Sequence, residues 1–193
     1  MNLNDFEIIL ASGSPRRQAY FKEMGFPFRV ETQDVDETFP KHLKGVAIAE
    51  HIVFEKAAPF REKIRPKQLI ITADTIVWHE NQCLGKPEDE AAAFQMLSSL
   101  SGKEHEVITA VGFLQQEQWE CIHAITKVKF KNLSQQTIQN YITSGSPMDK
   151  AGAYGIQDSI GTLGIETING SYTNVVGLPV VDVFAKIEEI ITG

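Results

Sequence analysis

Two spacings of apolar residues alternate along this chain, and they predict strands interleaved with helices. Short apolar runs rich in β-branched residues predict strands at residues 6–11, 28–32, 69–77, 105–115 and 119–131. The last two runs predict a hairpin that turns at 115–118, and Asn81-Gln82 predicts a second tight turn. Apolar residues at helical spacing, with capping residues at their ends, predict helices at 15–24, 46–64, 87–100, 134–145 and 179–191. The order of elements predicts an α/β protein.

Two stretches do not follow either spacing. Residues 33–44 are polar and predict a loop. Seven of the fourteen glycines lie between 145 and 177, interleaved with apolar residues, which predicts tight turns among β residues or close approach to a ligand. Neither stretch is a clean boundary, so we expect a single domain over 1–193.

Composition and charge narrow the class of protein. With 42% apolar and 22% charged residues, the 193-residue chain has an ordinary globular composition, which excludes disorder or collagen-like repeats. A formal charge of −7 argues against a nucleic-acid partner and against an anionic membrane. No apolar run approaches the roughly 18 residues of a membrane span, and the N-terminal one lacks signal-peptide flanks. Cys83 and Cys121 form no disulfide framework, so we expect a cytoplasmic protein.

A serine–glycine turn with two arginines is the first candidate site. Residues 12–17 (SGSPRR) lead from an apolar strand into a helix, where free backbone N–H groups and the helix dipole favour an anion. Arg16 and Arg17 add positive charge where the end of the helix dipole is already positive. An anionic ligand would neutralise both the arginines and the helix end. The pattern therefore predicts a phosphate site that includes Ser12 and Ser14. The alternative is that both arginines are solvated or paired with surface carboxylates.

Asp74 is the second candidate, because a carboxylate within the apolar run LIITADTIV is costly unless it is paired, hydrated or bound to a metal. It could act as a general base or hold a divalent cation, with Asp36 and Glu37 as further oxygen ligands for Mg²⁺. The alternatives are a strand end at which Asp74 meets solvent, and an exposed acidic loop.

Three further residue sets are weaker candidates. Lys56 and Lys86 could bind phosphate, although a snorkelling lysine and a turn residue are the simpler interpretations. Tyr154 and Gln157, in the glycine-rich segment DKAGAYGIQ, could contact a base, although packing of Tyr154 in the core is the simpler interpretation. The motifs GxxxxGK[ST], GxGxxG, HExxH and GxSxG are missing from the sequence, and the five histidines show no metal-ligand spacing.

Together these motifs give the chain a family resemblance. It resembles the Maf family of nucleotide pyrophosphatases in nine segments that follow the family's order: LASGSPRR, VDE, EKA, ADT, GKP, LSG, TAV, DKAGAYGIQ and NGSYTNVVGLP. The resemblance implies an elongated mixed β-sheet flanked by helices, with two lobes and a central cleft, similar to inosine triphosphate pyrophosphatases. It implies hydrolysis of nucleoside triphosphates to monophosphate and pyrophosphate with a divalent metal, Mg²⁺ first and Mn²⁺ or Co²⁺ as alternatives. It also implies a cytoplasmic homodimer and an association with arrest of septum formation.

The resemblance also implies roles for single residues. It makes Asp74 the proton acceptor, Glu37 an acidic residue near the metal, and Ser12, Arg17, Lys56 and Lys86 the residues that bind phosphates. Arg16, Thr75 and Gln157 are similar to the branch that hydrolyses dTTP and UTP, whereas Asp158 stands where that branch often has glycine. Two alternatives stay open: a nucleotide-binding regulator of cell division with little catalysis, and a pyrophosphatase directed at purines.

Overall fold

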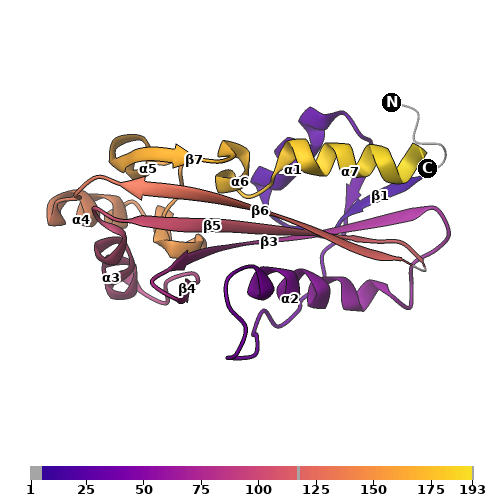
Figure 1. The fold of residues 1–193 in the computed structure, drawn as a ribbon, viewed down its shortest axis with the longest axis horizontal. Coiled ribbons are helices and arrows are strands. Elements are labelled where there is room, and N and C mark those ends of the chain that lie inside the picture. The colour runs from indigo at the N-terminus through magenta and orange to yellow at the C-terminus, as the bar shows by residue number, and fades with distance from the viewer. Residues whose placement is uncertain (1–5, 117, 193) are drawn as a thin grey trace. The chain divides into compact units, whose positions relative to one another are not determined.

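The strands and helices of a computed structural model, which describes residues 6–116 and 118–192, confirm the predicted α/β class (Figure 1). The strands are β1 Glu7–Leu10, β2 Phe28–Val30, β3 Gln68–His79, β4 Gln82–Leu84, β5 Glu104–Leu114, β6 Trp119–Phe130 and β7 Ile165–Asn169. The α-helices are α1 Pro15–Met24, α2 Val46–Ala57, α3 Glu90–Leu100, α4 Gln135–Thr143, α5 Ser159–Gly164, α6 Tyr172–Val176 and α7 Val180–Thr192. Short 3₁₀ helices occupy Ala58–Phe60 (η1), Ser146–Asp149 (η2) and Ala151–Ala153 (η3). No helix in the described ranges is both long and apolar enough to cross a membrane.

The strands form one mixed seven-stranded sheet, as the family resemblance implied. Its order is β2-β1-β3-β5-β6-β7, and β4 pairs with β3 beside this path. β1 runs parallel to both β2 and β3, whereas β4 is antiparallel to β3 and β7 is antiparallel to β6. The predicted hairpin joins β5 to β6, and the Gln115 amide donates to the Gln118 carbonyl across it at 2.9 Å. Glu117 in this turn lies outside the described residues.

The chain divides into two compact units. Unit 1 comprises Met1–Asp74, Thr109–Ala124 and Gly177–Gly193, and unit 2 comprises Thr75–Ile108 and Ile125–Val176. The boundaries fall within β3, within β5, within β6 and between α6 and α7. Each unit has its own cluster of buried apolar residues. A single domain in which two lobes share one core stays a prediction.

In unit 1 the two faces of the strands pack against different helices (Figure 1). On one face Ile8, Leu10 and Ile71 contact a cluster to which α1 contributes Phe21 and α7 contributes Ile187. The alternate residues point the other way, because successive side chains of a strand face opposite sides. There, Ile9, Ile70 and Leu114 pack with Ala57, Phe60 and Ile64 from the end of α2 and the residues after it. This packing fixes α1 and α2 on opposite faces of β1 and β3.

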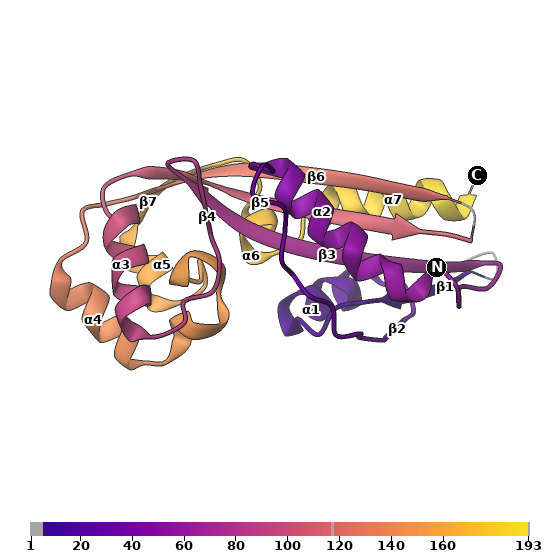
Figure 2. The ribbon, with the colours of Figure 1, turned by 90° about the horizontal axis from the view of Figure 1, so that it is seen from below.

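In unit 2 the three helices α3, α4 and α5 gather around one core (Figure 2). The helices contribute Leu97, Leu100, Ile138, Tyr141 and Ile160, and the strands contribute Val77, Val107, Val128 and Phe130. Tyr154 is 5% exposed and belongs to this core, where its ring lies 5.0 Å from that of Phe130. The core-packing interpretation of Tyr154 is therefore the correct one.

Three predicted boundaries were wrong for local reasons. The helix predicted over 46–64 ends at Ala57, because Pro59 has no N–H to continue it, and η1 follows. The helix predicted from residue 87 begins at Glu90, since Asp89 is the N-cap and its side chain accepts from the Ala92 amide at 2.7 Å. The tight turn comprises Glu80 and Asn81, both with positive φ, one residue earlier than expected.

The glycine-rich stretch 145–177 also differs from the expectation. Most of it forms short helices (η2, η3, α5 and α6), and β7 is the strand within it. Gly145 and Gly152 adopt φ values of 73° and 66°, which supply the sharp turns beside these short helices. Alternation of apolar residues was misleading here, because helices of three to six residues are too short to establish a helical period.

Candidate functional site

The turn between β1 and α1 has the local geometry of an anion site. Ser14 is the N-cap of α1, and its hydroxyl accepts weakly from the Arg17 amide at 3.5 Å. Ser12 is 7% exposed, and its hydroxyl accepts from the Ser14 amide at 3.3 Å. No acidic residue lies in the first turn of α1. The positive end of this helix therefore has no carboxylate of its own helix to neutralise it.

The two arginines of this turn play different parts. The Arg17 side chain turns into unit 1, where Nε donates to the Gly177 carbonyl at 2.9 Å and Nη1 donates to the Ala73 carbonyl at 2.9 Å. Nη1 also lies 3.3 Å from the Ser12 hydroxyl. Burial lowers the pKa of Arg17 below its usual range, and the nearby Asp74 carboxylate opposes that effect. Arg16 is half-buried and has no protein partner among the described side chains, so its guanidinium is available to a ligand.

Asp74 lies within β3, and its chain neighbours are held in place on both sides. The Thr72 hydroxyl donates to the Val53 carbonyl of α2 at 2.9 Å, and Arg17 holds the Ala73 carbonyl. Thr75, the next residue of β3, is half-buried. Its neighbours therefore anchor the backbone of Asp74 to α2 and to the first turn of α1.

The Asp74 carboxylate is paired with Lys56 of α2, which also reaches Glu37 in the loop before α2. The Lys56 ammonium lies 2.7 Å from Asp74 Oδ1 and 2.8 Å from Glu37 Oε1. The Lys56 and Asp74 side chains are 17% and 14% exposed, whereas Glu37 is 49% exposed. The snorkelling interpretation of Lys56 is therefore wrong. The single positive charge of Lys56 neutralises only part of the negative charge of the two carboxylates. Solvent screens the Lys56–Glu37 pair more strongly than the Lys56–Asp74 pair.

The donor types of this cluster suit a hard divalent cation. Asp74 and Glu37 supply carboxylate oxygens close together, and carboxylate oxygens are ligands that Mg²⁺ prefers. The described residues contain no group of three or more His, Cys, Asp or Glu side chains arranged to hold a metal ion. The Asp36 carboxylate accepts from the Thr38 amide of its own loop at 2.9 Å, and no described contact joins it to Lys56 or Asp74. A metal at this place would thus need phosphate oxygens and water to complete its coordination.

Unit 2 brings together two of the weaker candidate segments. The Gly152 amide donates to the Gly85 carbonyl at 3.0 Å, which joins the GKP segment to the glycine-rich one. An added Cβ at Gly152 would lie 2.9 Å from Val77, so glycine is required for this close approach. Lys86 is exposed and has no described protein partner for its side chain.

Gln157 is exposed at the tip of a four-residue turn in unit 2. The Asp158 amide donates to the Gly155 carbonyl at 3.1 Å and closes this turn. The Gln157 amide group has no described protein partner, so both its donor and its acceptor can meet a base. The Tyr154 hydroxyl instead lies 2.7 Å from His105 Nε2 within the core, and so it is not a base contact.

Sequence reasoning missed two features of these sites. It left Tyr141 of α4 without a role, yet the Tyr141 hydroxyl donates to the Asp158 carboxylate at 2.6 Å. It also found only that the histidines show no metal-ligand spacing, whereas His105 is 3% exposed and its Nδ1 has no described partner. The apolar spacing of Ile138, Tyr141 and Ile142 marks the buried face of α4, but no pattern in the sequence indicates where a buried hydroxyl finds its acceptor.

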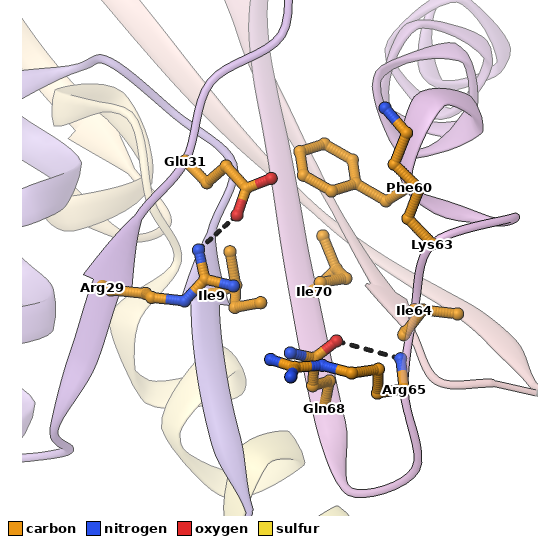
Figure 3. Close-up of a pocket in the computed structure, with 9 residues that line it drawn as sticks. All are labelled: Ile9, Arg29, Glu31, Phe60, Lys63, Ile64, Arg65, Gln68 and Ile70. Carbon is orange, nitrogen blue, oxygen red and sulfur yellow. Dashed lines mark hydrogen bonds and ion pairs between the residues drawn. The ribbon is translucent and has the colours of Figure 1, made fainter.

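A separate pocket in unit 1 has polar groups that already pair with one another (Figure 3). Its floor is apolar, with Ile9, Ile70 and Phe60. At its rim Arg29 pairs with Glu31, and the Arg65 amide donates to Gln68 Oε1 at 2.9 Å. None of the candidate catalytic or phosphate-binding residues lines this pocket, so we do not assign the chemistry to it.

The chain is similar to known proteins over nearly its whole length. A dTTP/UTP pyrophosphatase of Flavobacterium johnsoniae is 46% identical over 182 residues, which cover 94% of each chain. A dTTP/UTP pyrophosphatase of Bacteroides fragilis is 46% identical over 190 residues, which cover 98% of each chain. The structure of the Staphylococcus aureus Ham1 protein aligns with a TM-score of 0.47 at 12% identity, covering 64% of this chain and 71% of that one. The family model described as "Maf-like protein" matches residues 7–190, and this chain therefore belongs to the Maf-like protein family.

Proposed function

We propose that this protein hydrolyses pyrimidine nucleoside triphosphates, dTTP and UTP, to the monophosphate and pyrophosphate. The observation that carries the proposal is the Asp74 carboxylate, largely buried and paired with Lys56, beside a helix N-terminus that bears Arg16. The names of relatives about 46% identical over nearly the whole chain support it.

In this proposal the cations neutralise the triphosphate. Arg16, Lys56 and Lys86 contact phosphate oxygens, and the Ser12–Ser14 turn offers backbone N–H groups at the start of α1. Arg17 contributes charge while its bonds to the Ala73 and Gly177 carbonyls hold the turn against β3. Positioning and charge neutralisation supply most of the rate enhancement in phosphoryl transfer, and these residues provide both.

Asp74 orients a water, or takes its proton, for in-line attack on the α-phosphorus with pyrophosphate as the leaving group. A divalent cation, Mg²⁺ in the first instance, would be held by Asp74 and Glu37 and would supply charge neutralisation on the phosphates. As the triphosphate binds, its oxygens compete for the Lys56 ammonium, which frees the Asp74 carboxylate for this role. Thr75 and Gln157, with Arg16, are proposed to set the preference for pyrimidines.

We extend the proposal to the setting of the enzyme. We place the protein in the cytoplasm as a homodimer, because the resemblance to the Maf family implies both. Sedimentation of the purified protein at micromolar concentration tests the dimer, and a monomer at that concentration would contradict it.

The test is pyrophosphate release with Mg²⁺ from dTTP, UTP, CTP, GTP, ITP and 7-methyl-GTP. Asp74→Asn should lower kcat for dTTP and UTP by about a hundredfold or more, because it removes the group that activates water. Asp182→Asn is the matched control, since Asp182 is an exposed carboxylate in the first turn of α7. Binding of nucleotide without release of pyrophosphate would favour a regulator of cell division, and preferred turnover of GTP or ITP would favour a purine enzyme.

A further inference from the structure

The turn that carries Gln157 is held at both ends by one buried hydroxyl. The Tyr141 side chain is 3% exposed in the core of unit 2. Its hydroxyl accepts from the Gly155 amide at 3.2 Å and donates to the Asp158 carboxylate at 2.6 Å. Gly155 and Asp158 are the first and last residues of the turn, and Gln157 lies between them.

The Asp158 carboxylate serves this turn and not the helix that follows it. Asp158 occupies the N-cap position of α5, where an aspartate normally accepts from the first helical amides. Here its side chain makes no such bond. It accepts from Tyr141, and it also lies 3.5 Å from the ammonium of Lys150, whose side chain is 11% exposed.

Two glycines leave room for the contacts that Asp158 and the turn make. A Cβ added at Gly155 would lie 2.6 Å from Asp158 Oδ2 and 2.9 Å from Lys150 Cε, so the absence of a side chain at Gly155 leaves the space that the ion pair occupies. On the other side of the turn, a Cβ at Gly161 of α5 would lie 2.3 Å from the Ile156 carbonyl. Both glycines therefore let polar groups and backbone approach the turn more closely than any side chain would permit.

We propose that Tyr141 and Asp158 are positioning residues that hold Gln157 in the orientation needed to recognise a pyrimidine base. This inference rests on the proposed function, because it assigns base recognition to Gln157. Glycine at the first position of a turn leaves it many conformations, and two bonds to a single rigid hydroxyl remove most of them. A recognition amide that is fixed before binding discriminates between bases better than one that must first be ordered.

Tyr141→Phe tests the proposal, because it removes both bonds and leaves the buried ring in place. Loss of one or two hydrogen bonds should raise KM for dTTP and UTP about tenfold, with kcat within about a factor of two. KM for dGTP should change little, so the preference for pyrimidines falls about tenfold. Asp158→Ala should behave in the same way, and Asp158→Asn should restore much of the preference because its carbonyl still accepts from Tyr141. Tyr172→Phe is the matched control, since the Tyr172 side chain is 47% exposed.

Amide hydrogen exchange gives a readout that does not depend on turnover. Tyr141→Phe should accelerate exchange of the Gly155 amide, and Tyr172→Phe should not. Equal loss of activity towards all triphosphates, or an unchanged pyrimidine preference in folded Tyr141→Phe, would overturn the proposal. If the wild-type protein hydrolyses no triphosphate, the proposed function fails. The ratio of Kd values for dTTP and dGTP then replaces the ratio of KM values, and a ratio that Tyr141→Phe leaves unchanged overturns the inference separately.

Discussion

Lys56 is the residue on which two carboxylates of the candidate site depend. Replacing it with methionine keeps the length of the side chain but removes the ammonium that lies within 2.8 Å of both Asp74 and Glu37. The Asp74 charge is then largely buried without its partner. We expect Lys56→Met to lower the free energy of unfolding by about 2 kcal/mol and to lower kcat/KM for dTTP. Urea denaturation and initial rates measure the two effects.

A double variant separates loss of the ion pair from loss of packing. If the unpaired carboxylate causes the destabilisation, Lys56→Met combined with Asp74→Asn should be more stable than Lys56→Met alone. Glu37→Gln in place of Asp74→Asn should restore less stability, because Glu37 is 49% exposed and solvent already screens its charge. Equal stability of the single and double variants would show that altered packing of the side chain at position 56, and not the unpaired charge, causes the destabilisation.

His105 makes the stability of the protein depend on pH. Burial, followed by the effect of the nearby His79, lowers the pKa of His105 from 6.5 to about 3. The unfolded chain therefore binds a proton below pH 6.5 that the folded protein does not, and stability falls as the pH decreases from 6.5 towards 3. At pH 5 the contribution of His105 to this loss is about 2 kcal/mol. Urea denaturation at pH 7 and pH 5 measures the loss of stability between the two pH values. This loss should be smaller for His105→Gln than for the wild type, and it should equal the wild-type loss for the exposed His42→Gln.

At the scale of the element, Arg17 ties the first turn of α1 to the middle of β3 and to the segment before α7. A lysine cannot reproduce its fork of donors to the Ala73 and Gly177 carbonyls. We expect Arg17→Lys to lower the free energy of unfolding by about 2 kcal/mol. Arg16→Lys is the matched control, one residue away in the same turn. It should change stability by less than about 0.5 kcal/mol and raise KM for dTTP roughly fivefold. If Arg16→Lys instead lowered the stability more than Arg17→Lys, the assignment of Arg17 to the fold and of Arg16 to the ligand would be contradicted. Urea denaturation and initial rates of the two variants measure this.

How far the elements could be predicted depends on where the deciding interaction lies. Ser14, Pro15 and Gly25 bound α1 as expected, because caps act within a few residues of the chain. The start of α3 was misplaced because three acidic residues in a row, 88–90, each suit a first turn, and the sequence does not show which one caps the helix. The short helices of residues 145–177 were missed because tertiary packing, and not periodicity, stabilises them.

For the site, the sequence identified residue types and missed their partners. A carboxylate within an apolar strand indicated Asp74, since the desolvation cost follows from local sequence alone. The pairing of Asp74 with Lys56 spans 18 residues, and the bond from Arg17 to Gly177 spans 160. The Tyr141–Asp158 contact likewise depends on how α4 meets the turn at 155–158. Such contacts arise from the packing of elements, so they require a structure.

At the scale of the whole molecule, the metal should stabilise the protein only when the nucleotide is bound. Among the described residues no three ligating side chains converge, and Lys56 already neutralises part of the Asp74 and Glu37 charge. Mg²⁺ alone therefore gains little by binding. With a triphosphate present, the phosphate oxygens draw the ammonium away from the carboxylates and complete the coordination of the cation. The free energy of each ligand should thus depend on the presence of the other.

Thermal unfolding in four conditions tests this coupling: no ligand, Mg²⁺, a dTTP analogue with a non-hydrolysable α–β bridge, and both together. Mg²⁺ alone should leave Tm unchanged. At a hundred times Kd the pair should stabilise the protein by about 2.7 kcal/mol, which raises Tm by about 5–10 °C in a chain of this size. Glu37→Gln should reduce the increase in Tm that Mg²⁺ adds to that of the analogue. It should not change the increase in Tm that the analogue gives without Mg²⁺. A large shift with Mg²⁺ alone would mean instead that the protein holds the metal without substrate, so that Asp74 is a ligand first and free to act on water only secondarily.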